Sequence, residues 1–246
     1  MNICLFSSDE ISRPLAKNDE RAVHIVKVLH KNKGDCFDAG IIGGAAGIAT
    51  ITEISKDGQI SFSFEPKSRG KPLYPLILIV GFPRPIQLRR LLRDAAGLGC
   101  CKVILSGTTL TEKSYLDSNV VSDGSAEKML LDGTAQAAGT HVPQLLVAKS
   151  LKEAVELAKN SFEQEASLIA LDNRRPKESL HDFLQKEGAS QTIAAIGSER
   201  GWTDGERDFL EESGFTLCSM GSRILRTETA ATVAASLILD AMGFLN

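Results

Sequence analysis

Two patterns of hydrophobic and polar positions divide the chain. In the first 65 residues the apolar runs are short, and the last two alternate apolar with polar side chains, as half-buried β-strands do. The Asp57-Gly58 dipeptide between these two runs is a strong hairpin signal. The predicted strands cover residues 2–6, 35–42, 47–54 and 59–66, and helical spacing predicts one helix over 19–31. We therefore expect a small, barrel-like β domain.

From residue 73 onward, short apolar runs alternate with helical stretches, which is typical of an α/β domain with a mostly parallel sheet. The predicted strands cover residues 76–81, 101–105, 144–148, 167–171, 192–196 and 215–219. The predicted helices lie near residues 86–98, 125–138, 151–160, 178–187, 205–212 and 228–243. The polar segment 66–72 contains proline and glycine and is the best boundary in the chain. We predict one domain over residues 1–70 and a second over 71–246.

The segment IGSERGW (196–202) follows a predicted buried strand and precedes a predicted helix. Gly197 allows the backbone to turn, and Thr203 stands three residues before Glu206, which is the spacing of a capping box. Ligands bind at the carboxyl ends of the strands in open parallel sheets. The spacing fits neither a nucleophile elbow nor a phosphate-binding P-loop. A ligand-binding loop is one interpretation, and a purely structural turn is the other.

A second turn of the same kind follows the last predicted strand: a glycine and charged residues lie between a strand and a helix. Gly221 turns the chain, and Arg223 and Arg226 bracket two apolar residues before a helix that opens at Thr227-Glu228. Thr227 can cap this helix, and Glu228 suits the positive end of its dipole. The helix is apolar on nearly all faces, so it must be covered on all sides. We expect it to pack on its own sheet and on a second copy of the chain; the alternative is a central helix of a monomer.

Arginines gather on the predicted helix near 86–98. Residues 71–113 carry seven basic and two acidic side chains, although the whole chain has a net charge of −3. Such a basic island in an acidic protein is suited to a local contact with a polyanion. The candidate phosphate-binding residues are Arg84, Arg89, Arg90 and Arg93. The alternative is a solvated arginine face.

Composition narrows the class of protein. The 246 residues are 43% hydrophobic and 24% charged, as in an ordinary globular protein, and no apolar run reaches the roughly 20 residues that span a bilayer. The N-terminus lacks the pattern of a signal peptide, so we expect a cytoplasmic location. The five cysteines contain no C-x-x-C and the four histidines are scattered, so we expect no metal site. The glycine-rich segment 39–49 precedes a strand, and we interpret it as a tight turn.

Two motifs carry a resemblance to a known family. They are IGSERGWTDGE (196–206) and MGSRILRTETA (220–230), and smaller agreements are PRP (83–85) and EKSY (112–115). The chain resembles, over essentially its full length, the 16S ribosomal RNA uracil-N3 methyltransferases of the RsmE type, within the SPOUT class of trefoil-knot methyltransferases. The usual family pattern reads close to IGPEGG[FW][ST]xxE and LGxRILRxETA, and the second match is the more specific.

The resemblance implies a fold, a cofactor and a dimer. It implies a PUA-like, RNA-binding β-barrel over 1–70 and a SPOUT domain over 71–246 whose knotted loops bind S-adenosylmethionine. The implied homodimer forms through the knot and the C-terminal helix, and the implied substrate is small-subunit ribosomal RNA or the assembled small subunit. The implied cofactor-binding residues are Ala170, Leu171, Asp172, Ile196, Gly197, Ser198, Glu199, Gly201, Leu217, Met220, Gly221, Arg223, Ile224 and Leu225.

The expected reaction is methylation of uracil N3, with Arg226 as the candidate residue that stabilises negative charge on the base. The sequence indicates no general base. The chain departs from the family pattern at Gly97, Ala135, Ser198 and Arg200, and at Ala138-Gly139, where the family often has an arginine. Because of these departures, two alternatives stay open: a related methyltransferase with another RNA target, and a non-catalytic RNA-binding relative with a weakened cofactor site.

Overall fold

The computed structural model describes residues 2–116, 121, 123–187 and 190–245. The chain forms two compact units. The first unit contains the residues up to Pro72 together with Leu131–Val142, and the second contains Leu73–Leu130 and the residues from Pro143 onward. The separation of the chain into an RNA-binding domain and a catalytic domain stays a prediction.

The first unit is built on a four-stranded sheet in the order β1-β2-β3-β4. The strands are β1 (Cys4–Phe6), β2 (Cys36–Ile41), β3 (Ala46–Ile54) and β4 (Ile60–Ser68). The glycine-rich segment turns between β2 and β3, where Gly43 has a φ of +74°. In the described part of this unit the outer strands β1 and β4 do not pair, so a closed barrel is not confirmed.

The predicted helix of the first unit is shorter than expected. It consists of α1 (Glu20–Val23) followed by a π-helical turn over His24–Val28. The Arg21 guanidinium lies 4.7 Å from the centre of the Phe6 ring and hydrogen-bonds to Asp19 and Glu10. These bonds hold the helix start against β1, and the bond from Arg21 lowers the pKa of Glu10 to about 2.

The second unit is an α/β fold around a seven-stranded parallel sheet, in the order β7-β6-β5-β10-β8-β11-β9. Its strands are β5 (Tyr74–Gly81), β6 (Cys100–Ser106), β7 (Gln144–Ala148), β8 (Ser167–Leu171), β9 (Glu178–Ser179), β10 (Thr192–Ile196) and β11 (Thr216–Ser219). Its helices are α2 (Pro85–Leu98), α3 (Lys113–Leu116), α5 (Leu151–Lys159), α6 (Leu180–Glu187), α7 (Asp204–Glu212) and α8 (Thr227–Ala241). Helix α4 (Ser125–Gln136) begins in the second unit, and its residues from Leu131 onward belong to the first. The parallel sheet predicted from strand–helix alternation is confirmed, whereas β9 and α3 were not predicted.

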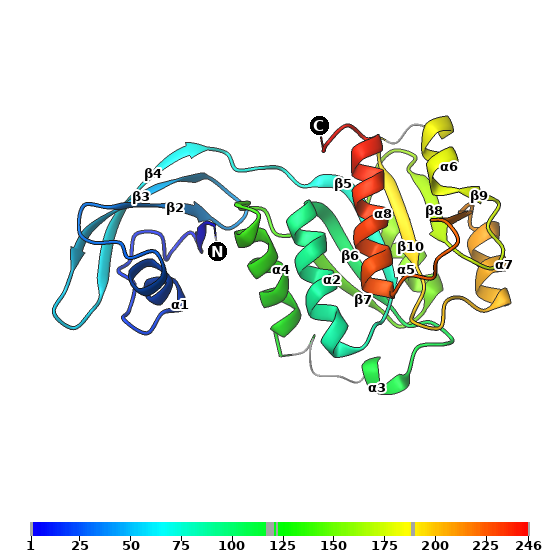
Figure 1. Cartoon of the computed structure of the whole chain (residues 1–246), viewed down its shortest axis with the longest axis horizontal. Helices are drawn as coiled ribbons and strands as arrows, with labels where there is room; N and C mark the ends of the chain where they lie inside the picture. The colour runs from blue at the N-terminus through cyan, green and yellow to red at the C-terminus, as the bar shows by residue number, and fades with distance from the viewer. Residues whose placement is uncertain (1, 117–120, 122, 188–189, 246) are drawn as a thin grey trace. The chain divides into compact units, whose positions relative to one another are not determined.

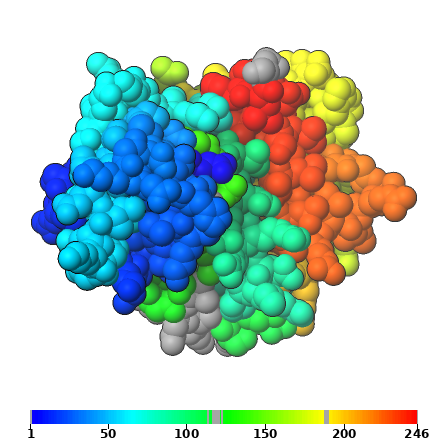
Figure 2. All heavy atoms as spheres, turned by 60° about the vertical axis from the view of Figure 1, so that its left-hand side comes forward, coloured from blue at the N-terminus to red at the C-terminus, as the bar shows by residue number. Residues whose placement is uncertain are grey.

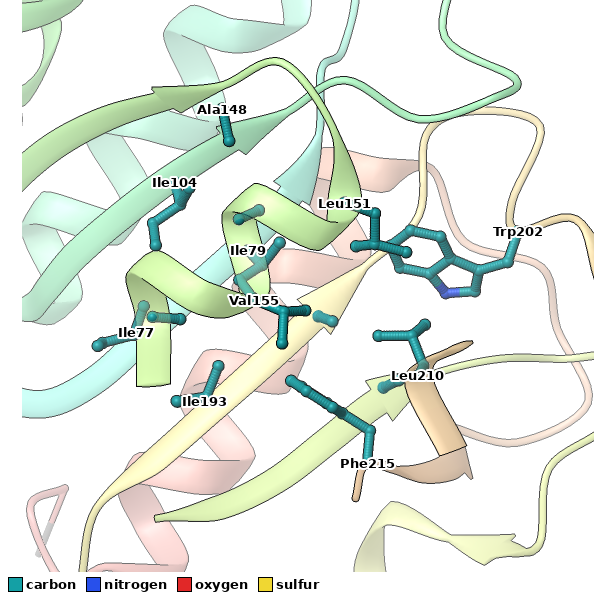
Figure 3. Packing of buried hydrophobic residues seen from close by; sticks show 14 of the residues in the cluster. Ile77, Ile79, Ile104, Ala148, Leu151, Val155, Ile193, Trp202, Leu210 and Phe215 are labelled. Carbon is teal, nitrogen blue, oxygen red and sulfur yellow. The ribbon is translucent and has the colours of Figure 1, made fainter. Parts of the chain in front are cut away.

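Helices cover both faces of this sheet (Figure 1). On one face α5 packs on β5, β6 and β7, and Figure 3 shows its Leu151 and Val155 among the apolar side chains of the strands, with Trp202 and Phe215 at the same cluster. On the other face α8 packs on β5, β10 and α2. Each large aliphatic side chain buried in this way contributes about 1.5–3 kcal/mol to folding.

Helix α8 is buried along one side only. Its residues Ala234, Ala235 and Ile238 are fully buried, whereas Val233 is 37% exposed and Leu237 is 45% exposed. Figure 2 shows part of α8, in red, at the surface beside α2. Within the described chain, no helix combines the length and the apolar character needed to span a membrane.

Candidate functional site

Three neighbouring strands release their loops at the same edge of the sheet. Ile196 of β10 pairs with Leu171 of β8, and Leu171 pairs with Cys218 of β11. The three strands are parallel, so the loops 172–177, 197–203 and 220–226 leave the sheet side by side.

These loops enclose a cleft of about 1040 Å³, together with the residues that open α2 and α8. A cleft at the carboxyl edge of a parallel sheet is the usual place for a small-molecule site in such folds. Its lining residues are Arg84, Gln87, Leu171, Asp172, Asn173, Arg174, Ile196, Gly197, Ser198, Glu199, Arg200, Gly201, Trp202, Arg207, Cys218, Met220, Gly221, Ser222, Arg223, Ile224, Leu225, Arg226, Thr227, Glu228 and Ala230.

The loop after β10 is a tight glycine turn. Gly201 has a φ of +73°, and its N–H donates to the Ser198 carbonyl over 2.8 Å. A Cβ on Gly197 would lie 3.0 Å from the Gly201 backbone, so a side chain there would push the opposite side of the turn away. The predicted capping box is present: the Thr203 hydroxyl accepts from the Glu206 N–H, and the Glu206 carboxylate accepts from the Thr203 N–H. Hydrogen bonds within the loop and to the start of α7 therefore define its conformation.

The loop after β8 is held by a buried ion pair. The Arg207 Nε donates to Asp172 Oδ2 over 2.7 Å, and the two side chains are only 3% and 2% exposed. The other oxygen, Asp172 Oδ1, accepts from the N–H groups of Arg174 at 2.7 Å and Arg175 at 2.6 Å. A buried charge needs such partners, and here they fix the backbone that forms one wall of the cleft.

Two side chains join the loops to each other. The indole Nε1 of Trp202 donates to the Leu171 carbonyl over 2.9 Å, which connects the second loop to the end of β8. The Thr227 hydroxyl donates to the Gly197 carbonyl over 3.3 Å, which connects the start of α8 to the second loop. The three walls are therefore one hydrogen-bonded unit.

The loop after β11 turns at Gly221, whose φ is +93°. Arg223 and Arg226 are exposed at the cleft, and neither guanidinium makes an ion pair within the described residues. Ile224 between them is 84% exposed. The loop thus presents beside the cleft one apolar side chain and two cations that have no ion-pair partner in the described part of the chain.

The structure brings most of the predicted site residues together. All the predicted cofactor-binding residues line the cleft except Ala170 and Leu217, and so does the predicted catalytic residue Arg226. Ala170 and Leu217 are fully buried in the core, each next to a lining residue on its strand. Their contact with a cofactor stays a prediction, as does that of the lining residues.

The predicted phosphate-binding arginines separate into three environments. Arg84 lines the cleft, where its backbone N–H donates to Glu199 over 3.0 Å and its Nε donates to the Tyr115 hydroxyl over 3.0 Å. The bond to Tyr115 raises the pKa of the Arg84 guanidinium. Arg89 and Arg90 are exposed on α2, away from the cleft lining, whereas Arg93 is half-buried.

Several lining residues were not predicted. Among them, Trp202 and Thr227 belong to the quoted motifs, so their neighbours in sequence pointed to them. Arg207 gave no local signal, because its partner Asp172 lies 35 residues away in the sequence. Its place at the site becomes visible only in the folded chain.

Comparison with known proteins gives three consistent findings. A family model described as an RNA methyltransferase domain matches residues 69–239. The chain is 38% identical to the ribosomal RNA small subunit methyltransferase E of Treponema pallidum, over 97% of this chain and 91% of that protein. It is 33% identical to the ribosomal RNA small subunit methyltransferase E 1 of Borreliella burgdorferi, over 97% of each.

Solved structures share the fold at lower identity. One is a ribosomal RNA small subunit methyltransferase E from Neisseria gonorrhoeae bound to S-adenosyl methionine, with a TM-score of 0.74, 20% identity, and coverage of 98% of this chain and 97% of that one. Another is the putative methyltransferase Lpg2936 from Legionella pneumophila in complex with S-adenosyl methionine, with a TM-score of 0.75, 20% identity and 98% coverage of both chains.

Proposed function

Because this chain belongs to the family of RNA methyltransferases known as ribosomal RNA small subunit methyltransferase E, we propose that it methylates N3 of a uracil in 16S ribosomal RNA. It is an S-adenosylmethionine-dependent methyltransferase that acts on small-subunit ribosomal RNA. The choice of uracil N3 is our inference from the two loop motifs at 196–206 and 220–230.

The observation that carries this proposal is the meeting of three parallel strand ends at one cleft. Glycine turns allow a polar nucleoside to approach the backbone closely, and the apolar strand ends Leu171 and Ile196 shelter a ring. The Ser198 hydroxyl is buried and has no hydrogen-bond partner among the described residues, so it can bond to a ligand at this wall. These residues fit S-adenosylmethionine, which supplies an activated methyl group when bound.

The protein's own residues then have to orient the two reactants and stabilise charge. Positioning a nucleophile in line with a reactive carbon accounts for a large part of such catalysis. Arg226 opens α8 at the cleft, and its cation can stabilise the negative charge that develops on the base when N3 loses its proton.

Two experiments test the proposal. Isothermal titration with S-adenosylmethionine should show one saturable site per chain, and the absence of binding would contradict it. Mass spectrometry of 16S ribosomal RNA from a deletion strain, before and after complementation, should show the loss and return of one N3-methyluridine. A different modified nucleotide would identify another RNA target for the same fold.

We also propose that RNA docks on an arginine edge formed by Arg84, Arg89 and Arg90. Arginine binds phosphate through a planar fork of donors, and three of these side chains stand exposed within seven residues. The first unit, which the resemblance relates to PUA-like domains, supplies a second RNA contact in this proposal. The support for the first unit is that resemblance together with its small sheet, in which β2, β3 and β4 pair antiparallel and β1 pairs with β2 in parallel.

A trefoil knot is the third element of the proposal. The strand order β8-β11-β9 means that residues 172–177 connect two strands that flank a later one. Asp172 donates its N–H to Cys218, and Lys177 donates its N–H to Leu217, so this connection runs close along β11. Threading of the last segment through it is consistent with these bonds. An experimental structure with 220–226 passing outside the connection would contradict it.

Finally, we propose a homodimer that works in the cytoplasm. The exposed apolar side chains Val233 and Leu237 on α8 support a second copy as the cover of that face. The location follows from the proposed ribosomal substrate. One chain has a mass of 26.4 kDa. Sedimentation equilibrium at micromolar concentration should give twice this mass, and the mass of a single chain would contradict the dimer.

A further inference from the structure

Three carboxylates line the cleft, and two of them are held by partners. Asp172 is bound by Arg207 and by two backbone N–H groups. Glu199 accepts from the Arg84 N–H over 3.0 Å, and the Arg84 guanidinium lies 4.0 Å away. Each of these two carboxylates therefore already accepts hydrogen bonds from protein donors at the cleft.

The third carboxylate, Glu228, is different. It lies in the first turn of α8 and is 2% exposed, and within the described chain its side chain makes no hydrogen bond and no ion pair. It is one of the residues that line the cleft. The neighbouring Thr227, bonded to Gly197, fixes the backbone at this point.

No other group in the described lining competes for the role. The lining contains no histidine, lysine or tyrosine. Cys218 does line the cleft, but burial raises its pKa to about 12, so the thiol keeps its proton at neutral pH. Glu228 is thus the one proton acceptor of the described cleft that has no protein partner to lose.

We propose that Glu228 is the catalytic base that takes the N3 proton of the target uracil. This inference rests on the proposed function. The N3–H bond breaks and its proton moves to a Glu228 oxygen. The electron pair left on N3 forms the new bond to the methyl carbon, and the electron pair of the broken carbon–sulfur bond stays on sulfur. Arg226, two residues earlier, balances the charge on the base while the proton is in transit.

The first test compares two variants of this residue. Glu228→Gln keeps the size of the side chain and removes its basicity, so kcat should fall about 10²- to 10⁴-fold, the usual contribution of a general base. Glu228→Asp keeps a carboxylate and should recover part of that loss. Calorimetric affinity for S-adenosylmethionine and filter-binding affinity for the RNA should stay within about threefold of the wild type.

Chemical rescue distinguishes proton removal from a structural role. RNA carrying 5-fluorouridine at the target has a more acidic N3–H, because fluorine withdraws electrons from the ring. The deficit of Glu228→Gln should therefore shrink at least tenfold on this RNA. Glu212→Gln, an exposed carboxylate of α7 outside the cleft, is the matched control and should behave as the wild type on both substrates.

The outcomes separate this inference from the proposed function. If the wild type forms no N3-methyluridine, the proposed function is wrong, and the role of Glu228 as the base for that reaction is wrong with it. If the wild type forms it and Glu228→Gln keeps full kcat, or its deficit is equal on both RNAs, Glu228 is not the base. Loss of cofactor affinity in both Glu228 variants would show a role in cofactor binding instead, and would also overturn the proposal.

Discussion

The buried ion pair of Arg207 and Asp172 leads to a quantitative prediction about the stability of the protein around the cleft. Replacing Arg207 with methionine keeps much of the side-chain volume and removes the cation from a carboxylate that is 2% exposed. The two backbone N–H groups still bind Asp172, but the charge loses its partner in a region with little water. Removing one partner of such a pair costs about 3–5 kcal/mol of the free energy of unfolding.

Urea denaturation followed by tryptophan fluorescence measures this change locally. Trp202 is the only tryptophan, is 2% exposed, and bonds to the end of the strand that leads into Asp172. The control is Arg175→Met, which removes a surface cation: Arg175 is 46% exposed and pairs with Asp208, which is 58% exposed, and with Glu211, which is 24% exposed. That variant should lose about 0–1 kcal/mol.

A double variant decides whether the unpaired charge is the cause. Asp172→Asn together with Arg207→Met removes both charges of this pair, so it should be more stable than Arg207→Met alone by about 2 kcal/mol or more. A loss below about 1 kcal/mol for Arg207→Met, or a double variant less stable than the single one, would refute the reasoning.

Three further predictions concern the cleft and its rim. Gly197→Ala places a methyl group 3.0 Å from backbone atoms and should weaken S-adenosylmethionine binding at least tenfold by calorimetry, whereas Gly205→Ala, which has open space, should leave it unchanged. Arg226→Ala should lower kcat about 10²- to 10³-fold with normal cofactor affinity, and full activity would remove its assigned role. Arg89→Ala and Arg90→Ala should each reduce the slope of log K for RNA against log salt by about 0.7–0.9, measured by fluorescence anisotropy; an unchanged slope would place RNA elsewhere.

Local patterns predicted most elements of the second unit. The strand run at 192–196 and the capping box at Thr203 and Glu206 appear where apolar continuity and the three-residue spacing placed them. Strand β9, at Glu178–Ser179, was not predicted because a strand of two residues is too short to show a periodic pattern. It is defined by its pairing with β11. The first unit was expected to close into a barrel. The alternation of apolar and polar side chains predicts a strand, but it does not predict which edge strands pair.

Sequence by itself determined the loop motifs, the glycines that turn them and the family to which the chain belongs. These features are local: a positive φ or a cap depends on residues a few positions apart. Only the tertiary structure decided that Arg207 neutralises Asp172, that Leu131–Val142 belongs with the first unit, and that Glu228 faces the cleft without a partner. The physical reason is that burial and pairing depend on distances in space. The parallel strands set these distances between segments that lie far apart in the sequence.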